Sequence, residues 1–196
     1  MRCGRFLGQF ALAILMALAA CKISAPASAK SEKTTGQEAA RKPAPEMERL
    51  QKLYAGTWDY TETYAKTPSA PQGGSDGGVY TSEPGPGGNS IVNRFHSHRA
   101  VGDFDGLLVI AWEPKESAYK SYVFGNDFPG CIVQTGHFEG DWLEFRSEFN
   151  AGGVTLKLRN VTRFLAPGKI VSEEDMAAAD APGKLFVSVD AKKRAQ

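Results

Sequence analysis

The chain has 196 residues with a formal net charge of +1, and it contains 42% hydrophobic and 23% charged residues. This length suits one domain of ordinary size with additional segments, and the 21 Gly and 11 Pro suit a globular β protein rich in turns. The small net charge gives no strongly basic surface, so nucleic acid is not an expected partner.

Residues 1–20 have the pattern of an export signal, in which two arginines precede an apolar run too short to span a bilayer. Two cleavage sites follow. Leu18-Ala-Ala-Cys21 matches the lipobox of bacterial lipoproteins, whereas Ala27-Ser-Ala29 matches an ordinary secretion site. The lipobox directly follows the apolar run, so the sequence favours a lipid anchor at Cys21. Either site predicts an exported protein of the bacterial envelope, lipid-anchored or periplasmic.

Residues 21–45 contain one large apolar residue, Ile23, and cannot bury enough surface to fold. We therefore expect a disordered tether. Pro45 then begins a short amphipathic helix that continues over residues 46–54, because proline is favoured in the first helical turn.

From Gly56 onward, Gly- and Pro-rich breaks recur at the spacing expected of sandwiches and barrels. Between these breaks the sequence predicts short strands, and no further long helical pattern interrupts them. The expected strands are 57–65, 77–83, 89–99, 106–112, 117–124, 131–139, 142–149, 153–163, 169–177 and 184–190.

Most of these strands alternate apolar and polar residues, which places successive side chains on opposite faces of a sheet. The run Leu107–Trp112 is continuously apolar and is expected to be buried on both faces. Consecutive short strands tend to close on themselves. The sequence therefore predicts an all-β fold: one antiparallel up-and-down β-barrel of about 8–10 strands over residues 46–190. A short helix precedes the barrel, and a basic tail, 191–196, follows it.

Four segments in order resemble known sequences: Gly56-Thr-Trp-Asp-Tyr60, Gly85-Pro-Gly-Gly-Asn-Ser90, Trp112-Glu-Pro-Lys-Glu-Ser-Ala-Tyr119 and Gly136-His-Phe-Glu-Gly-Asp-Trp-Leu-Glu-Phe145. The first resembles the Gly-x-Trp opening of the calycins, the lipocalin and fatty-acid-binding barrels. Together they resemble the bacterial family called domain of unknown function 1579. The resemblance implies a calycin-like barrel and brings no particular activity.

The aromatic residues of such a barrel could line a cup for an apolar ligand, as pockets usually are lined. The preferred hypothesis is an exported binding protein that holds a lipid or fatty acid, with Trp58 at the floor and Arg94 or Arg99 at a carboxylate head group. The candidate ligand-binding residues are Trp58, Tyr60, Tyr64, Arg94, Phe95, Trp112, Tyr122 and Phe138.

The three histidines suggest a metal as an alternative, because His96 and His98 share a strand face and His137 lies on another strand. Their spacing is not that of a known zinc motif, so no metal is expected. Nitrobindin-type haem barrels share the Gly-x-Trp opening, but they bind the haem iron through a histidine late in the chain. Residues 138–196 of this sequence contain no histidine. No cofactor is expected.

An enzyme is a second alternative. It would use a lumenal histidine or carboxylate on a small substrate. In Glu173-Glu174-Asp175 one side chain could face the lumen with a raised pKa and pair with Glu62, or all could form a charged outer face. The sequence shows no Gly-x-Ser-x-Gly motif and favours a binding protein over an enzyme. A third alternative is an envelope interaction protein with a solid core.

Cys131 is the one cysteine left once Cys3 is removed with the signal and Cys21 is lipidated or lost. The mature domain is therefore expected to lack a disulfide. A small buried residue is the expected role of Cys131, with a reactive thiol as the alternative. Nothing in the sequence indicates an oligomeric state.

Overall fold

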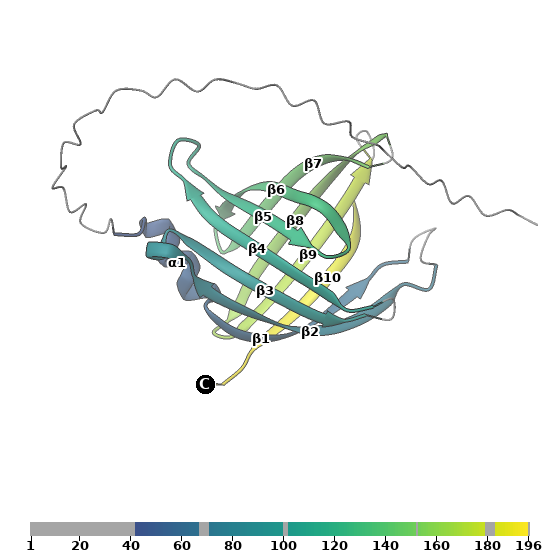
Figure 1. Ribbon diagram of the computed structural model, residues 1–196, viewed down its shortest axis with the longest axis horizontal. Helices are drawn as coiled ribbons and strands as arrows, with labels where there is room; N and C mark the ends of the chain where they lie inside the picture. Colours follow the sequence, from purple (N-terminus) through teal and green to yellow (C-terminus); the bar gives the residue numbers. More distant parts are fainter. Residues whose placement is uncertain (1–41, 67–70, 100–101, 152, 179–182, 196) are drawn as a thin grey trace, which may run out of the picture. The chain divides into compact units, whose positions relative to one another are not determined.

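The computed structural model describes residues 42–66, 71–99, 102–151, 153–178 and 183–195. In this part of the chain one helix, α1 (Pro45–Tyr54), precedes ten strands, with a single 3-10 turn at Pro86–Gly88 (Figure 1). The strands are β1 (Gly56–Tyr64), β2 (Gly74–Pro84), β3 (Ser90–His98), β4 (Phe104–Glu113), β5 (Ala118–Gly125), β6 (Phe128–Glu139), β7 (Trp142–Ala151), β8 (Val154–Ala166), β9 (Lys169–Ala178) and β10 (Lys184–Lys193).

Each strand pairs antiparallel with the next, and β1 also pairs with β10, so the sheet closes into a barrel. The closing register runs from Trp58 opposite Lys193 to Tyr64 opposite Val187. Closure leaves no unpaired sheet edge. The predicted fold class, an antiparallel up-and-down barrel with a short N-terminal helix, is confirmed.

The expected strand boundaries agree closely with the observed ones. The largest differences are of three residues. Among them, β2 and β6 begin at Gly74 and Phe128, before the expected 77 and 131, and β10 continues to Lys193, beyond the expected end of the barrel at residue 190. The predicted export signal, Cys21 and the tether up to residue 41 lie outside the described residues. None of the described helices is long and apolar enough to cross a membrane.

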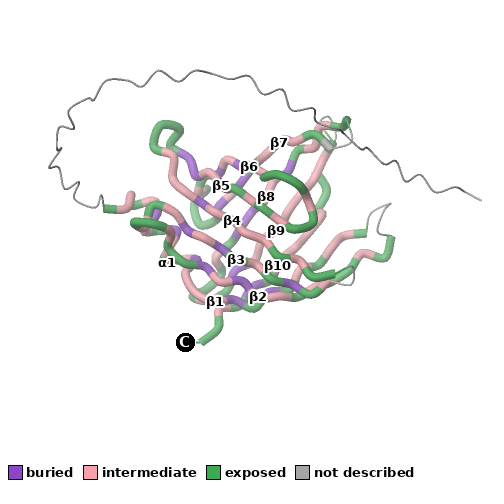
Figure 2. Tube along the Cα trace, viewed as in Figure 1, coloured by how far each residue is buried: buried purple, intermediate pink, exposed green. Residues whose placement is uncertain are grey.

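Side chains alternate between the barrel interior and its outer face, and buried positions recur accordingly along the strands (Figure 2). In β3, Ile91, Asn93 and Ser97 are buried, whereas Arg94 and His96 between them are exposed. This alternation decides which predicted residues reach the interior.

The helix α1 packs against one end of the barrel. Met47, Leu50 and Tyr54 form its buried side. The Gln51 side-chain nitrogen donates to the Gly88 carbonyl at 2.7 Å. Further hydrogen bonds run from Arg49 to the carbonyl of Gly140 and from the Tyr119 hydroxyl to the carbonyl of Glu46. The helix is therefore attached to strands and connections far away in sequence.

Trp58 connects this helix to the first strand. Its side chain is 1% exposed, and its indole N–H donates to the Tyr54 carbonyl at 2.7 Å. The indole also stacks on Tyr80, with ring centroids 5.7 Å apart. The expectation that Trp58 is buried next to the helix is confirmed.

Two expectations about burial are wrong. In β4, Ile110 is 1% exposed, but Val109 and Ala111 are only half-buried, because their side chains lie on the outer face of the barrel wall. Cys131 is exposed rather than buried, because Ile132, its neighbour in β6, takes the inward position.

Candidate functional site

The barrel contains a cavity of about 500 Å³. Side chains from all ten strands border it, and Tyr54 of α1 contributes from the helix. Most of the lining is apolar. Leu108, Ile110, Ile170 and Val189 are representative. The interior is therefore not solid, contrary to the solid-core alternative.

Aromatic rings form one wall of the cavity, near α1. Tyr80 lies between Tyr60 and Phe95, with ring centroids 5.9 Å and 5.1 Å away. Phe95 meets Tyr60 edge-on at 6.1 Å. Burial raises the pKa of Tyr80, and no charged partner offsets this effect, so the ring stays neutral. Trp58 lies directly beneath this wall.

Several polar groups also border the cavity. Ser121 donates to the Gln134 side chain at 3.0 Å, and the Thr162 and Ser172 hydroxyls lie 2.8 Å apart. In contrast, both amide atoms of Asn93, which is 1% exposed, lack a hydrogen-bond partner among the described residues. A buried polar side chain without a partner is costly, so the Asn93 amide is available to a ligand or to water.

Charged residues gather near the end of β1 that is farthest from α1. The Arg99 guanidinium lies 3.5 Å from Glu62 and 2.9 Å from Asp127, measured between nitrogen and carboxylate oxygen. The Tyr64 hydroxyl donates to Glu62 as well. Arg99 also covers the Phe104 ring, with its guanidinium carbon 4.0 Å from the ring centroid. We call Glu62, Arg99, Asp127 and Glu174 the charged end of the cavity.

Glu174 reaches the cavity through the strand register. Tyr64 of β1 is paired with Val187 of β10, which is paired with Glu174 of β9, and all three border the cavity. Burial raises the pKa of Glu174 to about 7; a hydrogen bond from Asn160 opposes the rise, and the negative charge of Glu62 adds to it.

The alternatives for the acidic run are thereby resolved residue by residue. Glu174 borders the cavity, as the enzyme hypothesis requires. Glu173 and Asp175 point the other way and pair with Arg163 at 2.7 Å and Arg159 at 3.4 Å. Strand alternation explains this division, because neighbours in a strand face opposite sides.

The candidate ligand-binding residues divide into four groups. Trp58 does not border the cavity itself and stacks on Tyr80, which does. Tyr60, Tyr64 and Phe95 border the cavity. Trp112 and Phe138 instead border a second depression of about 390 Å³ beside α1, where Arg49 lies 3.6 Å above the Phe138 ring.

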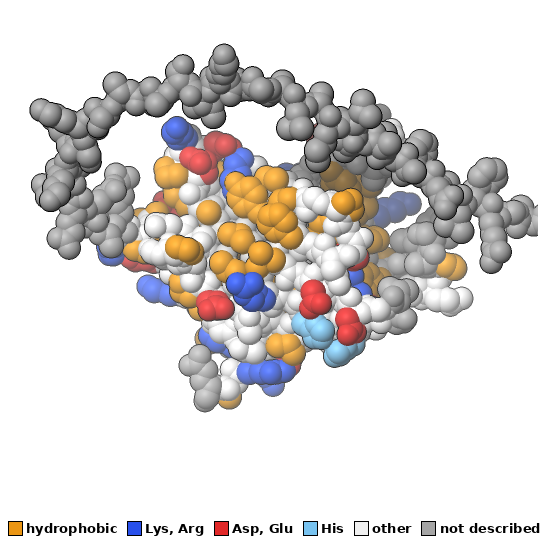
Figure 3. Space-filling view, in the orientation of Figure 1, with side chains coloured by type: hydrophobic (Ala, Val, Ile, Leu, Met, Phe, Trp, Pro, Cys, Tyr) orange, Lys and Arg blue, Asp and Glu red, His pale blue; other side chains and the backbone are white. Residues whose placement is uncertain are grey.

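Arg94 and Tyr122 do not reach the interior, so their proposed place in a ligand cup is wrong. Arg94 follows the inward residue Asn93 and is therefore exposed. Tyr122, which is 38% exposed, lies opposite Val133 of β6, which is 50% exposed, on the outer face. Figure 3 shows hydrophobic side chains gathered over β4 to β6.

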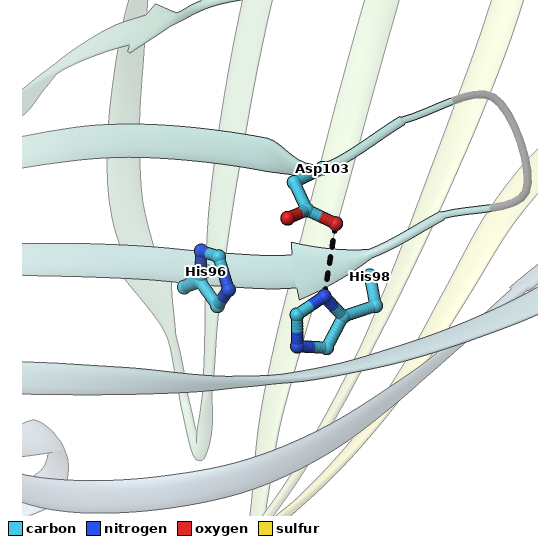
Figure 4. A group of neighbouring side chains, drawn as sticks. All are labelled: His96, His98 and Asp103. Carbon is cyan, nitrogen blue, oxygen red and sulfur yellow. Dashed lines mark hydrogen bonds and ion pairs between the residues drawn. The ribbon is translucent and has the colours of Figure 1, made fainter.

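The three histidines also lie on the outer face, so a lumenal histidine is excluded. His96 and His98 are neighbours, with ring centroids 4.8 Å apart, and the ligand atoms of both lie within 4.8 Å of Asp103 (Figure 4). His137, the third candidate, is not part of this group. The nitrogen Nδ1 of His96 bonds Asp105 at 2.8 Å, and that of His98 bonds Asp103 at 2.9 Å.

Each of the two histidines is therefore hydrogen-bonded to a carboxylate at the surface of the protein. The hydrogen bond with Asp105 raises the pKa of His96, and a bond from His98 lowers the pKa of Asp103. Each ring nitrogen Nε2 could bind a transition metal, but solvent competes fully for groups this exposed. The cavity is the better candidate site.

No family model matches the chain, and no curated protein matches it. Among solved structures it is similar to Rv2717c from M. tuberculosis, with 16% identity and a TM-score of 0.55 over 78% of this chain and 99% of that chain. It is also similar to the S-type phycobiliprotein lyase CPES from Guillardia theta, with 13% identity and a TM-score of 0.48 over 76% of this chain and 92% of that chain. At this identity the likeness to Rv2717c shows a common fold, and the chain has the fold of a calycin-like barrel.

Proposed function

We propose that this barrel binds a small, mainly apolar molecule in its cavity. The cavity itself carries the proposal: its volume of about 500 Å³ lies within the range of small-molecule sites, roughly 300–1,000 Å³. Such sites are mostly apolar with a few placed polar groups, and here Asn93, Gln134 and the charged end supply them.

The proposal extends to the location of the protein and to its family. The lipobox supports an exported bacterial envelope protein that is anchored through lipid on Cys21, followed by a tether to residue 45. The four sequence segments described above support membership in the family called domain of unknown function 1579.

Ligand binding is tested with a neutral fluorescent probe, Nile red, and a variant that fills the cavity. Ile132 borders the cavity, whereas its neighbour Val133 is 50% exposed on the outer face. We expect Ile132→Trp to weaken Nile red binding at least about tenfold, with Val133→Trp as the matched control that binds normally. Mass spectrometry of natively extracted protein would identify the resident molecule.

Circular dichroism must show that both variants remain folded. Failure of the unmodified protein to bind Nile red or any co-extracted molecule would overturn the proposal. Equal loss of binding in both tryptophan variants would also contradict it, because the outer face would then be the binding surface.

A small-substrate enzyme is the second candidate function, and Glu174 is the observation that favours it. A partly buried carboxyl whose pKa lies near neutrality can both donate and accept a proton at working pH. The test is whether the protein chemically converts its co-extracted molecule. Conversion that disappears in Glu174→Gln, while the molecule still binds, would replace the binding hypothesis with this one.

A further inference from the structure

We infer that the cavity selects apolar ligands that carry a protonated basic nitrogen, and that this nitrogen lies between Glu174 and Glu62. The inference rests on the proposed function and specifies the chemical class of its ligand. It replaces the carboxylate head group expected from the sequence with a cation.

The first argument is the balance of charge around the cavity. Among the described residues that border it, the acids are Glu62, Asp127 and Glu174, and the one cation is Arg99. Arg99 is already shared between Glu62 and Asp127. Glu174 therefore lacks a cationic partner, and a ligand is the remaining source of one.

The second argument concerns what a carboxylate ligand would meet. Both terminal nitrogens of Arg99 already face carboxylates of the protein, so a ligand carboxylate would have to compete with Glu62 and Asp127 for the two-pronged pairing that arginine offers. Nε of Arg99, which is buried without a partner among the described residues, could still donate, but the positive charge of the side chain is already offset by Glu62 and Asp127. A carboxylate there would add a negative charge beside Glu62 in a poorly solvated space.

The third argument is that an ammonium group has suitable partners at this place. It has three donors, which match the carboxylates of Glu174 and Glu62. The ring of Tyr64, whose hydroxyl donates to Glu62, borders this end of the cavity and can attract a cation through its face. The apolar body of the ligand would extend from there toward Leu108, away from the charged end.

Protonation of Glu174 gives the inference a pH dependence. The groups that face Glu174 are Glu62 from β1 and Asn160 from β8. The negative charge of Asp175, which follows Glu174 in β9, also raises the pKa of Glu174. Val187, its neighbour in β10, is apolar. An alkylamine stays protonated below about pH 10, whereas Glu174 loses its proton near pH 7. Amine binding should therefore strengthen as the pH rises through neutrality.

The test uses the full-length protein with three probes of equal chain length: octylamine, octanol and octanoate. Each probe competes with Nile red. At about pH 8 we expect octylamine to bind at least about tenfold more tightly than octanol, and octanoate more weakly than both. The preference for octylamine over octanol should shrink at about pH 5.5, where Glu174 is neutral.

The variant Glu174→Gln keeps the size of the side chain and removes its charge. It should remove most of the preference for octylamine over octanol. The control is Glu173→Gln, because Glu173 pairs with Arg163 on the outer face and should not affect any of the three probes.

The outcomes distinguish this inference from the proposed function. Tighter binding of octanoate than of octylamine, or an unchanged octylamine preference in Glu174→Gln, overturns the inference and leaves the proposed apolar cavity intact. If Nile red itself does not bind to the unmodified protein, the proposed function fails as well.

Discussion

The indole N–H of Trp58 donates to the main-chain carbonyl of Tyr54 at 2.7 Å, so the end of α1 is fixed directly to the first strand of the barrel. Tyr54 in turn borders the cavity and meets Phe164 edge-on at 5.3 Å. The hydrogen bond from Trp58 to Tyr54 thus connects the helix with the core and the cavity wall. Trp58 is therefore expected to contribute strongly to the stability of that end of the barrel.

Replacing Trp58 with alanine should therefore destabilise the protein strongly. Loss of a large buried aromatic side chain costs about 3–5 kcal/mol in unfolding free energy, because transfer energy is lost and a cavity remains. Chemical denaturation measures this change. The control is Trp142→Ala: this tryptophan is 41% exposed, so its loss should cost less than about 1 kcal/mol. Equal costs for the two variants would contradict the role given to Trp58.

Glu174 should make the stability of the unliganded protein depend on pH. Its pKa rises from 4.5 to about 7 on folding, so the folded state holds the proton more tightly than the unfolded state. Its stabilising contribution is complete below about pH 4.5 and is lost as the pH rises to about 7. Glu174→Gln should thus stabilise the protein at about pH 8, by on the order of 3 kcal/mol, and have little effect at about pH 4.

Denaturation curves at several pH values measure this difference between Glu174→Gln and the unmodified protein. Glu173→Gln again serves as the control, since its side chain pairs with Arg163 on the outer face. A stability difference that does not change with pH would show that Glu174 is ionised in the folded state throughout.

Arg99 and Glu62 should be energetically coupled. Their side chains are 19% and 17% exposed, so the pair is only partly screened by water. A double-mutant cycle of Arg99→Met and Glu62→Gln should give a coupling energy of about 1–2 kcal/mol. The corresponding cycle with Lys42 and Glu48, an ion pair whose Lys42 side chain is 83% exposed, should give less than about 0.5 kcal/mol. Similar coupling energies for both pairs would mean that water screens the Arg99–Glu62 pair as fully as it screens an exposed one.

His96 should titrate above its ordinary range, because its hydrogen bond with Asp105 raises its pKa. Nuclear magnetic resonance of the imidazole protons follows this titration directly. Asp105→Asn should lower the pKa of His96, and Asp103→Asn should lower it less, since Asp103 acts on His96 only through its more distant charge. A larger effect of Asp103→Asn would mean that the two histidines exchange partners in solution.

The fold was largely predictable because its local signals are strong. Gly and Pro mark most connections, and the alternation of Trp58, Tyr60, Glu62 and Tyr64 follows the observed inward face of β1. Such signals depend only on neighbouring residues. They place strands and faces without any knowledge of how the barrel closes.

The candidate site was less predictable, although one error could have been avoided. Arg94 and Phe95 are adjacent in β3, so they could not both face the interior, and an inward Phe95 implies an inward Arg99. The same reasoning separates Glu174 from its two acidic neighbours. In contrast, the cavity volume, the burial of Asn93 without a partner among the described residues and the ion pair of Asp127 with Arg99 depend on how distant strands come together, which no local pattern encodes.

The last prediction concerns the membrane. We expect Cys21 to be lipidated, because Leu18-Ala-Ala-Cys21 directly follows the apolar run of the export signal, whereas the alternative site lies beyond Lys22 and Pro26. An anchor at this place would suit the tether expected at residues 21–45, since such a segment would let the barrel stand away from the bilayer.

In the native host, the unmodified protein should therefore fractionate with membranes and carry the mass of several acyl chains, because a single chain gives only marginal membrane binding. Cys21→Ser should abolish both properties. Ala29→Leu is the matched control, since it blocks the alternative cleavage site and should change neither. A mature N-terminus at Lys30 without lipid mass would mean that the protein is cleaved by the ordinary secretion route and is free in the periplasm. In that case the tether would have no anchor to extend from, and the barrel would reach its ligand by diffusion.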